Sequence, residues 1–519
     1  MALFKIENLS FKYAGEESLA LKNISFETQK GEAIAVIGSS GSGKTTLLRS
    51  LKKSIAPKGE LSGEVKFFGG DEIKDIGFVF QNPYDQSVCQ TVFEELVFAP
   101  QNLGLAADII RVRVAEVCAF FGIGDLVSKK MSELSGGEVQ TVNLAAAAVL
   151  SPSVILLDEP TAQLDPISSQ RFTQSLKKLK DEMATSIIVS THSIENLLPF
   201  VDKILVLEDG RLSFFGDADE VMNLLKESKN PLALVGGGLP LISKFHVLKT
   251  VKQARDFLSV NDISFTPKPK LQSDFGETMI NAKGIYMRYE KYSKDVLCDV
   301  SLKVNKGEAL GLCGANGSGK TTLLSVLSKA LSPYSGKVKL GGDPLYIPQD
   351  PRMAFVKDSI YEDIKFLCEL SSIPLSEIDR VKNEYSFFNG IDEILDKHPY
   401  DLSGGELQKA VVLKALVADK DILLFDEPVK GLDPQAKEEF RKMILEIKSE
   451  KAIIIASHDI EFLADASDDI AMLFGGEIVS RKQSDEFVCE NSYFTTSLVR
   501  ATNGIKDGLI TSRQLWGEI

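Results

Sequence analysis

The most constraining feature of the sequence is a glycine-rich segment that occurs twice. VIGSSGSGKTTLL at residues 36–48 returns as LCGANGSGKTTLL at residues 312–324. Other residues repeat at nearly the same offset. Lys44 and Lys320 lie 276 positions apart, and Glu159 and Glu427 lie 268 positions apart. One deletion of eight residues accounts for most of this drift, so the chain is a tandem duplication and we expect two copies of one fold.

Each copy alternates short apolar runs with longer helical stretches. In the first copy, GEAIAVIG, SVILLD and TSIIVSTH predict buried strands, and KTTLLRSLKKSI predicts a helix that opens on the glycine-rich segment. The order strand, helix, strand favours an α/β fold with a mostly parallel sheet covered by helices. Residues 101–130 have helical spacing and form a predicted helical insertion between two sheet elements.

At 519 residues the chain is too long for a single hydrophobic core. We predict a first domain at residues 1–235, with a helical extension that begins near 217, and a second domain at 279–485. Residues 236–278 form the rest of the extension and a Pro- and Lys-rich linker, and residues 486–519 form a C-terminal tail.

Composition excludes several classes of function. A net charge of −14 argues against a general binder of nucleic-acid backbones. The six cysteines are scattered without a CxxC pair, which argues against zinc, iron–sulfur and disulfide frameworks. No apolar run approaches the ~18 residues of a membrane span, and the first residues do not resemble a secretory signal. These features predict a protein that stays in the cytoplasm.

The repeated segment matches the pattern GxxxxGK[ST], which cradles phosphates. Glycines let successive backbone N–H groups point at phosphate oxygens, and the following helix N-terminus favours negative charge. A functionless glycine-rich turn would not explain two copies that both lie between a strand and a helix. The predicted phosphate-binding residues are Gly38, Ser39, Ser40, Gly41, Ser42, Gly43, Lys44, Thr45 and Thr46, and Gly314, Ala315, Asn316, Gly317, Ser318, Gly319, Lys320, Thr321 and Thr322.

Two acidic residues end an apolar strand in each copy, in VILLDEP and ILLFDEP. Asp158 and Asp426 are placed to organise Mg²⁺ together with the hydroxyls of Thr45 and Thr321. Glu159 and Glu427 could polarise a water molecule for attack on the γ-phosphate. The alternative, a solvated acidic turn, does not explain two pairs at matched distances from two phosphate loops. We therefore expect ATP and Mg²⁺ as cofactors.

The full order of motifs resembles the ATP-binding cassette ATPases. In both copies a phosphate loop, a glutamine, the segment LSGGE, an Asp-Glu strand and a strand-end histidine follow one another, over residues 3 to about 230 and 280 to about 485. The resemblance implies two tandem P-loop NTPase domains, each with an antiparallel β part and a helical subdomain. It implies adenine stacking on Tyr13 and Tyr289, metal and water sensing by Gln81 and Gln349, and γ-phosphate contact by His192 and His458.

In such ATPases each site is composite, so the resemblance also implies an intramolecular cassette dimer. The nucleotide of one copy would be closed over by Ser135, Gly136 and Gly137, or by Ser403, Gly404 and Gly405, of the other. Glu138 and Glu406 stand where the family usually has Gln, and the usual Arg after this signature is missing. These departures leave the relative turnover of the two sites open.

The segment FVFQNPYDQSVCQTVFEELVFAPQNLGL, residues 78–105, is similar to the ATPases of energy-coupling factor importers. This implies a motor at the cytoplasmic face of the membrane, with a transmembrane coupling subunit and a membrane-embedded substrate-binding subunit as partners. The cargo would be a vitamin, a vitamin precursor or a transition-metal ion, and the fused architecture suggests a thiamine precursor. The alternatives are a soluble twin-cassette ATPase that acts on ribosomes or nucleic acid, and the fused ATPase of a sugar importer.

Overall fold

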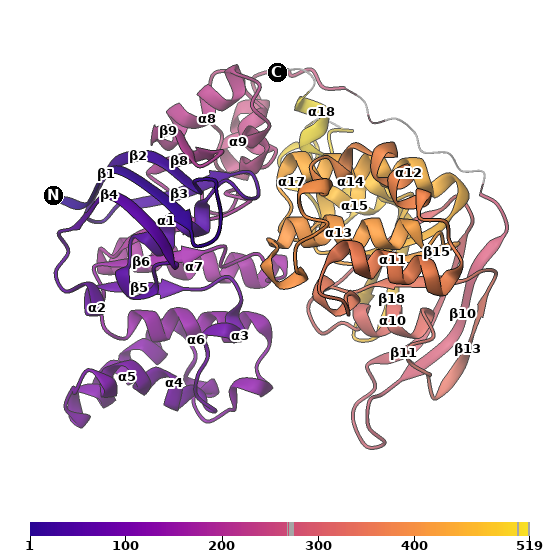
Figure 1. Ribbon diagram of the computed structural model, residues 1–519, viewed down its shortest axis with the longest axis horizontal. Helices are drawn as coiled ribbons and strands as arrows, with labels where there is room; N and C mark the ends of the chain where they lie inside the picture. Colours follow the sequence, from indigo (N-terminus) through magenta and orange to yellow (C-terminus); the bar gives the residue numbers. More distant parts are fainter. Residues whose placement is uncertain (267, 269–274, 506–507, 517–519) are drawn as a thin grey trace. The chain divides into compact units, whose positions relative to one another are not determined.

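The chain divides into two compact units, Met1–Lys249 and Thr250–Ile519. The structure is a computed structural model, and it describes residues 1–266, 268, 275–505 and 508–516. Parts of the predicted linker and tail, at 267, 269–274, 506–507 and 517–519, lie outside the described residues. Each unit is an α/β fold, so the predicted fold class is confirmed (Figure 1).

The described part of the first unit contains two sheets. The strand order of the antiparallel sheet is β2 (Leu21–Gln29), β1 (Ala2–Tyr13) and β4 (Gly59–Phe67). The order of the larger sheet is β5 (Ile76–Val79), β6 (Val154–Asp158), β7 (Ser186–Ser190), β3 (Ala33–Gly38), β8 (Lys203–Glu208) and β9 (Arg211–Asp217). All pairs in the larger sheet are parallel except β8 with β9. Strands β3, β6 and β7 are buried along their whole length, as expected for parallel strands covered on both faces.

The helices of the first unit either follow strands of the larger sheet or lie around β5, between β4 and β6. Helices α1 (Lys44–Ser50) and α7 (Pro166–Met183) follow strands of the larger sheet, and α8 (Ala218–Glu227) follows β9. A helical part lies between β5 and β6 and contains α3 (Pro83–Gln86), α4 (Val92–Asn102), α5 (Ala107–Phe121) and α6 (Gly136–Ala148). The short helix α2 (Glu72–Asp75) precedes β5. Figure 1 shows α4, α5 and α6 on the β5 side of the unit, away from β1 and β2.

The second unit repeats this plan. In its described residues the antiparallel sheet has the order β11 (Leu297–Asn305), β10 (Thr278–Met287) and β13 (Ser335–Leu340). The larger sheet has the order β14 (Pro344–Ile347), β15 (Ile422–Asp426), β16 (Ala452–Ala456), β12 (Ala309–Cys313), β17 (Asp469–Phe474) and β18 (Glu477–Gln483). The same strand order in both units is the structural counterpart of the sequence duplication.

The helices of the second unit include one that precedes its first strand. Helix α9 (Val251–Leu258) packs against α17 (Ser497–Thr502), so residues before β10 and residues of the tail form one helical appendage. The other helices are α10 (Lys320–Leu327), α11 (Ile360–Ser371), α12 (Ser376–Glu384), α13 (Gly404–Val417), α14 (Pro434–Ile447), α15 (Ile460–Ala466), α16 (Ser484–Glu490) and α18 (Ser512–Trp516).

Candidate nucleotide sites

Each glycine-rich loop joins a buried strand to a helix, from β3 to α1 in the first unit and from β12 to α10 in the second. The residue before each helix, Gly43 or Gly319, has a φ of 98° or 105°, which L side chains rarely adopt. A Cβ at Gly43 would lie 2.8 Å from the carbonyl oxygen of Ala20. The loop therefore requires glycine at this position for its backbone turn and for its packing.

The loop lysines are buried and point back into their own loops. Lys44 Nζ donates to the carbonyls of Gly38 and Ser39 at 3.0 and 2.9 Å. Lys320 Nζ donates to Gly314 and Ala315 at 2.8 and 3.3 Å. An ammonium group that is held by neutral carbonyls at a helix N-terminus can exchange these bonds for charged phosphate oxygens, which are stronger partners.

The threonine and the aspartate predicted to hold the metal meet in both units. Thr45 Oγ1 donates to Asp158 Oδ1 at 3.0 Å, and Thr321 Oγ1 donates to Asp426 Oδ2 at 2.7 Å. Burial raises the pKa of both aspartates, and the donating hydroxyls oppose that shift. Asp158 Oδ2 is buried and has no hydrogen-bond partner among the described residues. A carboxylate and a hydroxyl are the hard oxygen groups that suit Mg²⁺, so these residues fit the ion that the motif implies.

The glutamate after each strand has a left-handed backbone, with φ of 44° at Glu159 and 52° at Glu427. Non-glycine residues rarely adopt this conformation, and such strain concentrates at functional sites. In the first unit His192 Nε2 lies 2.7 Å from Glu159 Oε1, and Gln81 Nε2 donates to Glu159 Oε2 at 3.1 Å. The predicted glutamine, glutamate and histidine of this unit therefore form one cluster.

The second glutamate has different surroundings. His458 Nε2 lies 3.3 Å from Glu427 Oε1 and 3.4 Å from Lys320 Nζ. Ser457 Oγ and the backbone N–H of His458 donate to Glu427 Oε2 at 3.3 and 3.2 Å. Burial raises the pKa of Glu427 to about 7, although the charge of Lys320 opposes it. Burial also acts to raise the pKa of Glu159, but the charge and hydrogen bond of His192 and the charge of Lys44 together outweigh burial and lower that pKa.

The two predicted tyrosines lie against the helix that follows each phosphate loop. The hydroxyls of Tyr13 and Thr46 are 2.8 Å apart, and those of Tyr289 and Thr322 are 2.9 Å apart. Both rings are partly exposed, at 36% and 62%. An aromatic face that stays accessible beside a phosphate loop can stack on a base.

The LSGGE segments form helix N-termini in both units. Ser135 caps α6 and Ser403 caps α13, each in a capping box with the glutamate three residues later. Glu138 Oε2 accepts from the N–H and the hydroxyl of Ser135 at 2.8 and 2.7 Å, and Glu406 does the same for Ser403. Glutamate at these positions therefore has a structural role as the partner of the signature serine.

The structure adds residues that the sequence did not single out. Ser190 and Tyr346 donate to Asp158 and Asp426, respectively. Glu95 and Asp363 are buried carboxylates at equivalent helix positions, and they hold the loops that follow Gln81 and Gln349. The offset of 268 between Glu95 and Asp363 matches that between the two glutamines, and this was the available signal.

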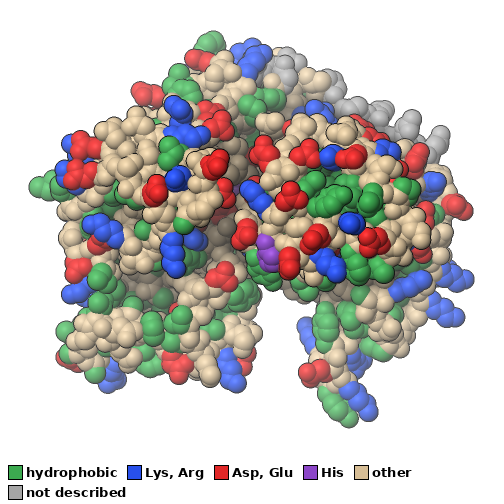
Figure 2. All heavy atoms as spheres, viewed as in Figure 1, with side chains coloured by type: hydrophobic (Ala, Val, Ile, Leu, Met, Phe, Trp, Pro, Cys, Tyr) green, Lys and Arg blue, Asp and Glu red, His purple; other side chains and the backbone are tan. Residues whose placement is uncertain are grey.

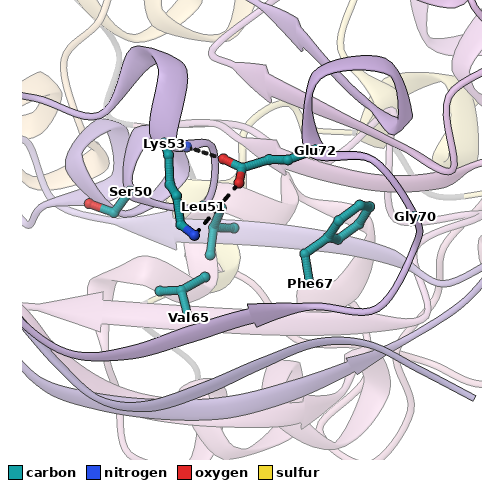
Figure 3. A pocket seen from close by; sticks show the side chains of 7 residues that line it. All are labelled: Ser50, Leu51, Lys53, Val65, Phe67, Gly70 and Glu72. Carbon is teal, nitrogen blue, oxygen red and sulfur yellow. Dashed lines mark hydrogen bonds and ion pairs between the residues drawn. The ribbon is translucent and has the colours of Figure 1, made fainter.

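One pocket of about 140 Å³ lies away from these clusters. It is found at the C-terminal end of α1, whereas the phosphate loop is at the N-terminal end of that helix. Figure 3 shows its seven lining residues, with Glu72 close to Lys53; the others are Ser50, Leu51, Val65, Phe67 and Gly70. None of the predicted nucleotide residues lines it.

Comparison with known proteins agrees with this geometry. The family described as "ABC transporter" matches residues 21–162 and 297–430. A Bacillus anthracis protein with the provisional name ABC transporter ATP-binding protein is 36% identical over 526 residues, which cover 96% of this chain and 94% of the relative. The chain belongs to the ATP-binding proteins of ABC transporters. Its two units are ABC cassettes, and ABC ATPase domains bind ATP and typically Mg²⁺.

Two further comparisons concern a relative and a solved structure. The HMP/thiamine import ATP-binding protein YkoD of Bacillus subtilis, also a provisional name, is 29% identical and covers 91% of this chain and 90% of its own length. The archaeal ribosome recycling factor aABCE1, solved with the stalk protein aP1, has a TM-score of 0.61 at 22% identity. That alignment covers 93% of this chain and 91% of the other, and it shows a shared fold alone.

Proposed function

We propose that this chain is the two-cassette ATPase of an energy-coupling factor importer. The observation that carries the proposal is the segment from Gln81 to Leu105, whose sequence is similar to the ATPases of such importers. The similarity to an HMP/thiamine import protein supports a vitamin or vitamin-precursor cargo, and a thiamine precursor is the first cargo to assay. Transition-metal ions are the other cargo class of these importers.

The local structure of that segment suits a docking role. Tyr84 is 56% exposed and Val88 is 65% exposed, although both follow Gln81 closely. Glu95 Oε2 accepts the backbone N–H groups of Val88 and Cys89 at 3.0 and 2.9 Å, which fixes the loop while its apolar side chains face outward. Figure 2 shows hydrophobic side chains at the surface of this helical part of the first cassette.

The second cassette presents a similar surface after Gln349. Asp363 Oδ2 accepts from the N–H groups of Val356 and Lys357 at 2.6 and 2.9 Å, while Met353 and Val356 are exposed. Within the residues that the structure describes, no helix has both the length and the apolarity that a membrane span requires. We propose that membrane subunits dock on these two loops at the cytoplasmic face, so that the loops couple each nucleotide site to transport.

The residues of each site can be assigned roles in hydrolysis. We propose that Lys44 and Lys320 bind phosphate oxygens, that Asp158 and Asp426 with the neighbouring threonines hold Mg²⁺, and that Glu159 and Glu427 orient the attacking water. Magnesium, when bound, neutralises charge on the phosphates. Gln81 and His192 keep the carboxylate of Glu159 in place through the contacts described above. We further propose an intramolecular dimer in which the signature segment of one cassette closes the nucleotide of the other.

Affinity purification of the full chain from its native membranes tests the proposal. We expect small hydrophobic membrane subunits to co-purify, and a vitamin-like ligand to be released from them on denaturation. Recovery of ribosomes in their place would support the twin-cassette ATPases that act on ribosomes, and recovery of sugar-permease subunits would support a sugar importer. The control is a Tyr84→Asp/Val88→Asp/Met353→Asp/Val356→Asp variant, which should retain ATP binding and lose the membrane subunits.

A further inference from the structure

Each site aspartate receives a second hydroxyl hydrogen bond, and the two cassettes supply it from different strands. In the first cassette Ser190 Oγ, on β7, donates to Asp158 Oδ1 at 2.7 Å. In the second cassette Tyr346 Oη, on β14, donates to Asp426 Oδ2 at 3.0 Å. The threonine of the phosphate loop donates to that same oxygen in each case.

The strand registers show that the second hydroxyl comes from opposite sides of the aspartate strand in the two cassettes. Asp158 pairs with Ser190 across β6 and β7, whereas the equivalent partner of Asp426 is Ala456 on β16. On the other side of the aspartate strand, Phe78 of β5 pairs with Leu156, and Tyr346 of β14 pairs with Leu424. A hydroxyl that is missing from one neighbouring strand is thus replaced by one from the opposite neighbour.

This arrangement leaves one carboxylate oxygen available in each site. Both hydroxyls bond Oδ1 of Asp158, and its Oδ2 is buried without a hydrogen-bond partner in the described part of the chain. Both hydroxyls bond Oδ2 of Asp426 in the same way. A carboxylate that is fixed through one oxygen presents the other in a defined direction, which is how groups behind a metal ligand tune metal binding.

We propose that Ser190 and Tyr346 are equivalent positioning residues, which orient Asp158 and Asp426 for the magnesium that accompanies the nucleotide. The inference depends on nucleotide and metal binding at these sites, and it does not depend on the identity of the membrane partners. It assigns the same task to a serine and a tyrosine that do not align in the duplicated sequence.

Manganese with ATP is the probe, because electron paramagnetic resonance measures its binding without hydrolysis. The parent is the full chain with Glu159→Gln and Glu427→Gln, in which Lys44→Ala isolates the second site and Lys320→Ala isolates the first. At the second site we expect Tyr346→Phe to raise the Mn²⁺ dissociation constant about 10-fold, and added Ala456→Ser to restore it to within about 2-fold. At the first site Ser190→Ala should produce a similar loss.

Tyr385→Phe is the matched control, because its hydroxyl donates to Glu384 at 3.1 Å in the helical part of the same cassette. It should leave Mn²⁺ binding unchanged, and the single tryptophan, Trp516, reports folding of the second unit. Unchanged Mn²⁺ affinity in Tyr346→Phe and Ser190→Ala would overturn the inference, as would failure of Ala456→Ser to restore affinity in a folded variant. Absence of Mn²⁺ binding in the parent would overturn the nucleotide-site assignment together with this inference.

Discussion

In the first cassette Glu159 contacts Gln81 and His192, whereas in the second Glu427 contacts Ser457 and His458. The positions of the two glutamates and their left-handed backbones are the same. Their proton affinities differ, because His192 lowers the pKa of Glu159 and burial raises that of Glu427. The two copies therefore share the glutamate and its backbone conformation but differ in the hydrogen-bond partners of its carboxylate.

A second difference follows the glutamate. Lys430 lies three residues after Glu427, whereas Ala162 stands at the equivalent position of the first cassette. Burial lowers the pKa of Lys430, and the charges of Glu427 and Asp426 oppose that shift. The two sites thus receive an additional positive charge from different positions, from Lys430 near Glu427 and Asp426 in the second and from Arg49 near Asp158 in the first.

The largest expected effect tests what the two cassettes share. Glu159→Gln together with Glu427→Gln should lower steady-state ATP hydrolysis at least about 100-fold, because the amide no longer accepts a proton from the attacking water. Binding of radiolabelled ATP should persist. Glu64→Gln, which changes an exposed glutamate on β4, should leave turnover unchanged. Undiminished hydrolysis in the double variant would remove both glutamates from the proposed mechanism.

The next prediction concerns which signature segment serves which site. A Cβ at Gly404 would meet no atom within 4 Å, so Gly404→Asp should fit within its own cassette. Its carboxylate should repel phosphates held by the partner cassette, by several kcal/mol at an intermediate dielectric of about 20. In this variant, labelling by a photoreactive ATP should decrease in peptides around Lys44 and should remain unchanged in peptides around Lys320.

Gly136→Asp should give the opposite labelling pattern, because it changes the equivalent glycine of the first cassette. Gly124→Asp adds the same charge at another open position of the helical part and should change neither label. If Gly404→Asp instead reduced labelling around Lys320, each cassette would close its own nucleotide, and the proposed composite sites would be wrong.

A smaller effect compares the carboxylates that hold the two docking loops. Glu95→Gln removes charge-assisted bonds from two backbone N–H groups and should cost about 1–3 kcal/mol locally. Asp363→Asn should cost more, about 3–5 kcal/mol, because Asp363 is fully buried and also pairs with Lys414. Hydrogen exchange should accelerate at Val88 and Cys89 in the first variant, and further at Val356 and Lys357 in the second. Equal acceleration of hydrogen exchange in the two variants would show that the ion pair between Asp363 and Lys414 does not stabilise the second loop.

The last comparison concerns two helices outside the sheets, α8 with Lys226 and α9 with Arg255. Lys226 is buried, and its ammonium donates to the carbonyls of Pro240, Ser243 and His246. Burial lowers the pKa of Lys226 from 10.5 to about 8. Between these values the unfolded chain binds more protons, so stability should rise with pH by up to about 1.4 kcal/mol per unit.

The check is the difference in unfolding free energy between the natural chain and Lys226→Met, measured in urea at several pH values. The difference should be constant below pH 8 and should move in favour of the natural chain from there to pH 10.5. Arg255, whose guanidinium donates to the carbonyls of Arg500 and Asn503 at an exposed position, provides the contrast. Arg255→Ala should show no such dependence, and a flat difference for Lys226→Met would contradict the assigned burial.

The sequence predicted the fold and the motif residues because their spacing is fixed by backbone geometry. A glycine-rich loop between strand and helix and an acidic residue at a strand end are local patterns, and in the structure Lys44 begins α1 and Asp158 ends β6. Ser190 and Tyr346 escaped prediction because their contact with an aspartate depends on strand register, which the chain order alone does not specify. Glu95 also escaped, since its partners are backbone N–H groups that any sequence would supply.

The number of ATP molecules bound per chain tests most directly whether both duplicated sites work. It should be measured by equilibrium dialysis with Mg²⁺ and ATP, on the full chain carrying Glu159→Gln and Glu427→Gln so that bound nucleotide is not consumed. We expect two ATP molecules per chain, falling to one when either Lys44 or Lys320 is changed to Ala. A single bound ATP in the parent, lost with one of these lysines and unaffected by the other, would show that one cassette does not bind nucleotide and that the proposed pair of working sites is wrong.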